Sequence, residues 1–205
     1  MACNDCKMEP CNAAQIKVLR TLFFINAVMF VAEMVAGILA DSTGVMADSL
    51  DMLADASVYA IGMVSVGRAI GFKILAARAS GTLQILIAVG ILVDIVRRIL
   101  GGSEPVSALM LGISIVALAA NIYSLRKISE HRDGGVHMRA SWIFSKNDVI
   151  ANCGVILAAV LVYLTHSNLP DIVIGCLITL VVLRGGIEIL RDAASEKQSI
   201  TEQSC

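Results

Sequence analysis

The 205-residue sequence is short of the residue types on which soluble domains and membrane barrels depend. Only 16% of its residues are charged and 57% are hydrophobic, whereas about a quarter of the residues in a soluble domain are charged. Aromatic residues make up 4% and there are three prolines, so the aromatic girdles of an outer-membrane barrel are missing. The composition therefore predicts an all-α membrane protein.

Other absences exclude further classes of protein. The net charge is −1 and no basic cluster is present, which excludes a nucleic-acid partner. No Ser/His/Asp or Cys/His arrangement and no phosphate-cradling glycine loop occurs, so we expect neither an enzyme nor an ATP-driven machine. Residues 1–11 lack the pattern of a cleavable signal peptide, and we expect the first span to direct insertion itself.

Apolar stretches separated by turn residues predict a bundle of six transmembrane helices. The stretches are 18–40, 45–66, 74–100, 106–125, 140–165 and 171–190, with one sizeable loop at 126–139. The expected organisation is a polar cytoplasmic tail with cysteines (1–16), a transmembrane domain (17–192) and a short cytoplasmic polar tail (193–205).

The distribution of positive charge predicts the orientation. Of the sixteen Lys and Arg residues, twelve fall on the side that would hold both termini, and only Arg97 and Arg98 fall on the other. Positive residues favour the cytoplasmic side of a membrane. We therefore expect a multi-pass protein of the cell's inner membrane with both termini in the cytoplasm.

Ionisable side chains inside the apolar stretches are the main functional signal, because each costs about 2.5 to 3.5 kcal/mol on insertion scales. They are Glu33, Asp48, Asp51, Asp55, Asp94, Lys146, Asp148, Arg184 and Glu188. Spacings of three and four put Asp48, Asp51 and Asp55 on one stripe of a helix. Like charges on one stripe repel unless protons or a cation neutralise them.

A metal site follows from the same spacing on a second helix. Asp148 and Asn152 are four residues apart, as are Asp51 and Asp55. At about 1.5 Å of rise per residue, all three aspartates reach the middle of a hydrocarbon layer about 30 Å thick. Asp51, Asp55, Asp148 and Asn152 are therefore the predicted ligands of one tetrahedral divalent metal ion.

Structural roles that involve no metal stay open for several of these residues. Asp51 and Asp55 could instead form salt bridges with Lys146 or Arg184. Asp48 lies near a helix N-terminus, where the helix dipole alone favours an acid, and an exit station for metal is the alternative. The remaining acids, Glu33, Asp94 and Glu188, are interpreted as packing ion pairs.

Two segments, GVMADSLDMLADAS and NDVIANCGVILAA, with Glu33 and Gly37 upstream, resemble the second and fifth helices of the cation diffusion facilitator (CDF) family of divalent-metal/proton antiporters. The resemblance covers about residues 17–192 and implies metal ligands at positions 51, 55, 144 and 148. Phe144 departs from the family, because a phenyl ring cannot bind metal, so Asn152, Ser145, Asn147 or water is left as fourth ligand. The sequence resembles a minimal form without the family's cytoplasmic C-terminal domain and His-rich loop.

The resemblance implies a homodimer in the lipid bilayer that exports metal from the cytoplasm in exchange for protons, since carboxylates bind metal only when deprotonated. The metal is cargo and not a cofactor. The family favours Zn²⁺, Co²⁺ or Cd²⁺, whereas an oxygen-rich site favours Mn²⁺ or Fe²⁺. The alternatives are a transporter of another cargo whose acids relay protons, and a non-transporting membrane metal-binding sensor or partner subunit.

The cysteines bear on the second alternative. Cys3, Cys6 and Cys11 follow a C-x2-C-x4-C spacing, which supplies part of a thiolate zinc site that Cys205 could complete. A reduced tail without a metal is the other interpretation. Cys153 and Cys176 are interpreted as small apolar fillers.

Overall fold

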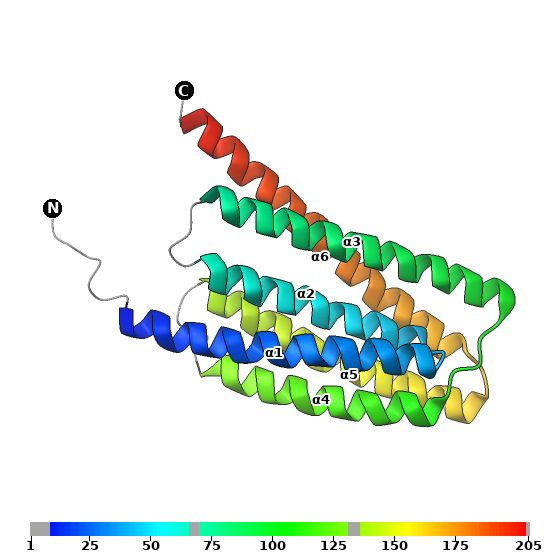
Figure 1. The fold of residues 1–205 in the computed structure, drawn as a ribbon. Helices are drawn as coiled ribbons and strands as arrows, with labels where there is room; N and C mark the ends of the chain where they lie inside the picture. The colour runs from blue at the N-terminus through cyan, green and yellow to red at the C-terminus, as the bar shows by residue number, and fades with distance from the viewer. Residues whose placement is uncertain (1–8, 66–69, 131–135, 204–205) are drawn as a thin grey trace.

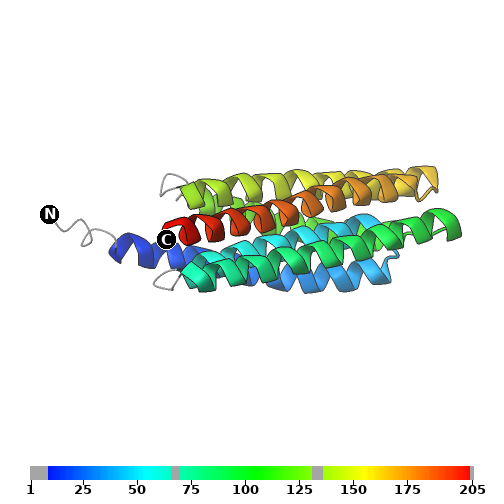
Figure 2. The same cartoon turned by 90° about the horizontal axis from the view of Figure 1, so that it is seen from above.

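A computed structural model describes residues 9–65, 70–130 and 136–203, and in this part of the chain there are six α-helices and no strand (Figure 1). The helices are α1 Glu9–Leu39, α2 Thr43–Ser65, α3 Ile70–Gly101, α4 Ser107–Ser129, α5 Val136–Thr165 and α6 Leu169–Gln203. They run roughly along one axis, and both termini lie at the same end, as Figures 1 and 2 show. The prediction of an all-α, six-helix bundle is confirmed.

We call the end that holds both termini the terminal end, and the opposite end, where α1 connects to α2, α3 to α4 and α5 to α6, the far end. By length and composition, five of the helices could cross a membrane, namely all except α2. α2 differs because three aspartates interrupt its apolar sequence. It packs against α1, α3, α5 and α6, so its acidic stripe can face protein instead of lipid.

Several helices extend beyond the apolar stretches that predicted them. α1 begins at Glu9, inside the segment expected to be a tail, and α6 continues to Gln203 through most of the expected C-terminal tail. The connection between α4 and α5 is shorter than predicted, because α4 ends at Ser129 and α5 begins at Val136. Apolar residues indicate the part of a helix inside the membrane, but the helix can continue beyond it through polar residues of high helix propensity such as Glu, Lys and Gln.

Close approaches between helices fix the position of α2. A Cβ atom on Gly37 of α1 would lie 2.7 Å from Cγ of Met46, and one on Gly175 of α6 would lie 2.8 Å from the carbonyl carbon of Thr43. Glycine at these positions lets the neighbouring backbones approach closely. α2 is therefore held against α1 on one side and α6 on another.

Three apolar clusters lie along α2. Towards the far end, Leu50 belongs to a large cluster shared with α3, α5 and α6 that includes Ile91 and Val155. Towards the terminal end, Tyr59 packs with Leu22 and other apolar residues. Between them, Met52 packs with Met29 of α1 and Ala117 of α4 in a third cluster. The acids of α2 thus lie among apolar packing.

Candidate metal-binding site

The three predicted aspartate ligands come together in the middle of the bundle. Asp55 on α2 and Asp148 on α5 are both buried, and Asp51 is half-buried. The Asp148 carboxyl lies within hydrogen-bonding reach of the carboxyls of both Asp51 and Asp55. Carboxylates this close repel one another unless a proton or a cation lies between them.

The fourth predicted ligand, Asn152, lies one helical turn closer to the far end. Its side chain is 0% exposed, and its Nδ2 donates to Oδ1 of Asp48 (3.4 Å) and to the backbone carbonyl of Asp148 (3.0 Å). Its Oδ1 has no hydrogen-bond partner. The amide is therefore engaged with Asp48 in this structure.

Tyr59 is a site residue that the sequence analysis missed. Its hydroxyl donates to Oδ2 of Asp55 (3.1 Å) and lies 3.3 Å from Oγ of Ser145, and both Tyr59 and Ser145 are buried. Tyr59 follows Asp55 by four residues, so the same helical spacing that linked Asp51 to Asp55 could have found it. These two hydroxyls bound the site on the terminal side.

Glu33 corrects the sequence-based interpretation. It was expected to form a packing ion pair, but its side chain is 1% exposed and neither carboxylate oxygen has a hydrogen-bond partner. The charges close enough to act on it are those of Asp48 and Asp51. Glu33 therefore belongs to the acidic group and not to an ion pair.

Asp48 is also placed differently from the preferred interpretation. It is buried a turn inside α2, beside Asn152, and does not lie at the helix N-terminus. The acid that interacts with the first backbone N–H groups of α2 is Asp171, from the start of α6. Asp48 is consequently free to take part in the site.

The basic residues proposed as salt-bridge partners do not reach these acids within the described part of the chain. Lys146 is exposed and lies over the ring of Trp142, with its Nζ 6.0 Å from the ring centroid, and Arg184 is exposed. The ion pairs that the structure shows there join Asp41 or Asp94 to Arg97 or Arg98. The expected pairing of Asp94 is confirmed, whereas the expected pairing of Glu188, which is exposed, and the salt-bridge alternative for Asp51 and Asp55 are not seen among the described residues.

In this conformation, no three His, Cys, Asp or Glu side chains of the described residues converge closely enough to hold a metal ion. The carboxyls of the central group interact pairwise, so a bound cation would require them to reorient or water to complete the coordination. Two predicted features lie outside the described residues or side chains. These are Phe144 and the cysteine cluster of Cys3, Cys6, Cys11 and Cys205.

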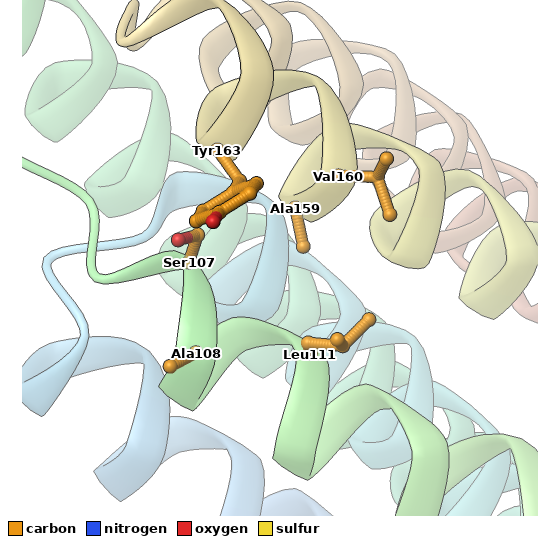
Figure 3. A pocket seen from close by; sticks show the side chains of 6 residues that line it. All are labelled: Ser107, Ala108, Leu111, Ala159, Val160 and Tyr163. Atoms are coloured by element: carbon orange, nitrogen blue, oxygen red, sulfur yellow. The ribbon is translucent and has the colours of Figure 1, made fainter.

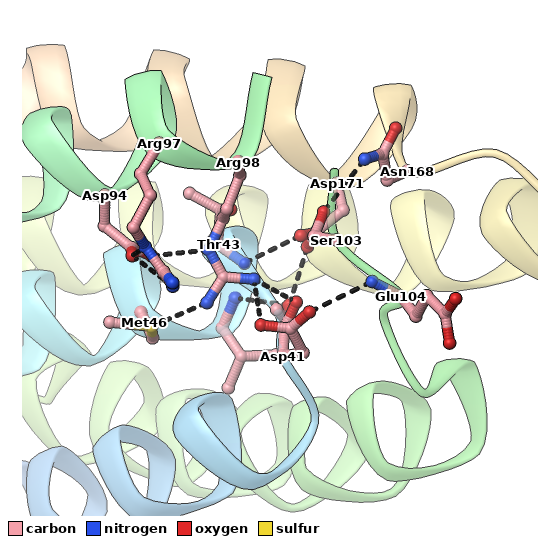
Figure 4. Close-up of polar contacts among 12 residues, drawn as sticks. Asp41, Thr43, Met46, Asp94, Arg97, Arg98, Ser103, Glu104, Asn168 and Asp171 are labelled. Carbon is pink, nitrogen blue, oxygen red and sulfur yellow. Dashed lines mark hydrogen bonds and ion pairs between the residues drawn. The ribbon is translucent and has the colours of Figure 1, made fainter. Parts of the chain in front are cut away.

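At the far end, Asp171 caps α2 (Figure 4). It is 0% exposed, and its carboxylate accepts hydrogen bonds from Oγ of Ser42 (2.6 Å) and from the backbone N–H groups of Thr43 (2.7 Å) and Gly44 (2.9 Å). Backbone N–H groups at a helix start lack intrahelical partners, and an acid there satisfies them. α6 is thereby joined to the start of α2.

Arg98 extends this network to α3 and the loops. Its side chain is 4% exposed and forms ion pairs with Asp94 and with Oδ1 of Asp41 (2.6 Å), while also donating to the Asp41 carbonyl (Figure 4). Oδ2 of Asp41 in turn accepts from the backbone N–H of Glu104 (3.0 Å). The network links the far ends of α2, α3 and α6 with the loops between the helices.

A pocket of about 310 Å³ lies away from these acids, between α4 and α5 (Figure 3). Its lining consists of Ser107, Ala108, Leu111, Ala159, Val160 and Tyr163. With no charged group in this lining, the pocket is unsuited to an ion. The acids on α2 are thus the better candidate.

Comparisons with known proteins identify one family model and several relatives. A family model described as the cation efflux transmembrane domain matches residues 19–196. The chain is 28% identical over 211 residues to "Zinc transporter ZitB" of Pectobacterium atrosepticum, covering 96% of this chain and 64% of that protein. It is 29% identical over 124 residues to "Cadmium, cobalt and zinc/H(+)-K(+) antiporter" of Bacillus velezensis, covering 60% of this chain and 40% of that protein. The chain thus spans less than two thirds of the length of these relatives.

Proposed function

Because the chain belongs to the cation diffusion facilitator family, whose cation efflux transmembrane domain covers most of it, we propose that it exports a divalent transition-metal cation in exchange for protons. Members of the family are transporters and not enzymes. The proposed cargo is Zn²⁺ first, followed by Co²⁺ and Cd²⁺, since the relatives are named for these ions. The metal is substrate, bound by Asp51, Asp55 and Asp148 with Asn152 or water.

One observation carries the proposal. Five acids lie near one another in the middle of the bundle, and no basic side chain of the described residues pairs with them. Burying a charge without a partner is costly, so these groups must hold protons or a cation. Protons and metal then compete for the same oxygens, because a carboxylate binds metal only after it loses its proton. Such competition is the chemical basis of antiport.

The direction of transport is part of the proposal. The end with twelve Lys and Arg residues is taken as cytoplasmic, and the far end as the outside of the cell's inner membrane. Metal would enter from the terminal side past Tyr59 and Ser145, and the far-end network would open to release it. A homodimer is proposed on the family resemblance alone, and chemical cross-linking in nanodiscs that yields only monomers would contradict it.

The choice of metal depends on the ligands. Asp51, Asp55, Asp148 and Asn152 offer only oxygen atoms, which suit harder ions such as Mn²⁺ or Fe²⁺ better than a site with histidine does. The relatives' names favour the zinc group. Both groups of ions therefore belong in the test.

The test is uptake into proteoliposomes under an imposed pH gradient, with Zn²⁺, Co²⁺, Cd²⁺, Mn²⁺ and Fe²⁺ compared. We expect metal flux coupled to proton flux in the native chain, and its loss in Asp51→Asn and Asp148→Asn. Glu188→Gln is the matched control, because Glu188 is an exposed acid on α6 and should leave the flux unchanged. Flux that persists in both aspartate variants would contradict the proposed site.

A second candidate is a non-transporting membrane metal-binding protein, a sensor or partner subunit. Phe144 favours it, since this residue stands where the family has a ligand, and so does the lack of a converged three-ligand group in the described residues. Metal binding without flux of any ion, in the same proteoliposomes, would favour this reading over transport.

A further inference from the structure

Glu33 lies at a defined level beside α2. α1 and α2 are antiparallel, with Gly37 against Met46 and Sδ of Met34 3.9 Å from Oγ of Ser49. This register places Glu33 next to residue 50, between Asp48 and Asp51 along the helix. The charges of both aspartates act on Glu33, as this position requires.

The carboxylate of Glu33 is unpartnered although it is almost completely buried. Neither Oε1 nor Oε2 has a hydrogen-bond partner, and the side chain is 1% exposed. Leaving a buried polar group unsatisfied costs about 1 to 3 kcal/mol, and more for a charged one. A bound cation would satisfy both oxygens.

Asn152 supplies an independent observation at the same level. Its Nδ2 donates to Asp48 on one side, while its Oδ1, in a side chain that is 0% exposed, has no donor to accept from. An unpaired amide oxygen is a cation ligand that does not take up a proton at neutral pH. The arrangement therefore suits a cation better than a proton relay.

We propose that Glu33, Asp48 and Asn152, from α1, α2 and α5, form a second cation station one helical turn closer to the far end than the site at Asp51, Asp55 and Asp148. This inference rests on the proposed function and deepens it. The station takes the same divalent cation as it leaves the first site, with two carboxylates and one amide oxygen as ligands. Rotation of the Asn152 amide by half a turn would present its Oδ1 where Nδ2 now meets Asp48.

Charge balance supports two stations instead of one. Glu33, Asp48, Asp51, Asp55 and Asp148 carry up to five negative charges, and one divalent ion offsets only two of them. Asp51 lies between the levels and adjoins both groups. A cation can thus move by about one turn of helix, or roughly 5 Å, while carboxylate oxygens remain within reach of it.

The test measures how many ions bind to the full chain. Purified protein in nanodiscs is dialysed against Zn²⁺ or Mn²⁺, and bound metal is counted by mass spectrometry. We expect two ions per native chain at saturation, one in Glu33→Gln, one in Asp55→Asn and none in the double variant. Asp48→Asn serves the same purpose as Glu33→Gln if the latter fails to fold, and Glu188→Gln is the control that should bind two.

The outcomes separate this inference from the proposed function. One ion in the native chain, lost in Asp55→Asn and kept in Glu33→Gln, would overturn the second station and leave the transporter intact. No bound ion in the native chain would overturn both. If Glu33→Gln changes the ratio of protons to metal in transport but leaves the number of bound ions unchanged, Glu33 carries a proton and the cation station is wrong.

Discussion

At the far end of the bundle, the acids that contact Arg98 or the start of α2 each have a hydrogen-bond donor. The acids halfway along α2 lie mostly beside other acids. Asp171 accepts three hydrogen bonds and Arg98 pairs with both Asp41 and Asp94. Asp148, by contrast, faces other carboxyls. Acids with fixed donors hold helices together, while acids without them are left for exchangeable cations and protons.

α2 connects the two groups. Its first residues are held by Asp171 from α6, and its acids begin only a turn further on. A movement that opens the far end must release this cap or carry α6 along with α2. The network therefore ties the far ends of α2, α3 and α6 together.

The largest effect on stability is expected from Asp171→Ala. This change leaves the N–H groups of Thr43 and Gly44 and the hydroxyl of Ser42 without their acceptor. Each buried donor left unsatisfied costs about 1 to 3 kcal/mol, so we expect a loss of about 3 kcal/mol or more. Thermal unfolding in detergent measures it.

The matched control is Glu104→Ala, because Glu104 is an exposed far-end acid that contributes only its backbone N–H to the network. It should leave the melting temperature nearly unchanged. Equal melting temperatures for Asp171→Ala and Glu104→Ala would show that the cap does not hold α2 in place.

Neutralising a central acid should have a smaller effect of opposite sign. In metal-free protein, Asp148→Asn replaces a carboxyl that must stay protonated or repel Asp51 and Asp55 with a neutral amide that can donate to them. We expect a stability gain of about 1 kcal/mol, as relief of repulsion and one added hydrogen bond suggest. The measurement is thermal unfolding without metal and with saturating Zn²⁺.

Added Zn²⁺ sharpens this comparison, because a ligand stabilises the state that binds it. The native chain should gain melting temperature with Zn²⁺, and Asp148→Asn should gain much less. Destabilisation of the metal-free protein by Asp148→Asn would contradict the view that the central acids repel one another, and would favour a structural role like that of Asp171.

The sequence predicted that three aspartates lie near one another because the evidence for it is local, and metal binding by them stays a prediction. Acids at spacings of three and four must share a helix face, and Asp51, Asp55 and Asp148 do come together. The six helices were predictable for a similar reason, since apolar length reflects membrane thickness. Helix ends were not, because α6 continues to Gln203 on helix propensity after the apolar stretch has ended.

Long-range packing decided what the sequence could not. Glu33 and Asp94 are both acids inside an apolar stretch of the sequence. In the structure, Glu33 lies among acids, whereas Asp94 lies beside two arginines. The arginines follow Asp94 by three and four residues on its own helix, whereas Glu33 meets its neighbours only through the contact between α1 and α2. Asp171 likewise reaches Ser42 across 129 positions of the chain.

The smallest of the expected effects concerns Tyr59→Phe. The ring remains in its apolar cluster with Leu22, while the hydroxyl that donates to Oδ2 of Asp55 is lost. One such hydrogen bond contributes about 1 kcal/mol, so stability should change little. Metal affinity should fall by about tenfold, because a carboxylate ligand is oriented by the groups that hydrogen-bond to it.

Zn²⁺ titration of the protein in nanodiscs measures this affinity. Tyr163→Phe, at an exposed tyrosine, is the control. Equal affinities in the two variants would mean that the Tyr59 hydroxyl only fills space between α2 and α5, and that Asp55 is oriented by its neighbouring carboxyls alone.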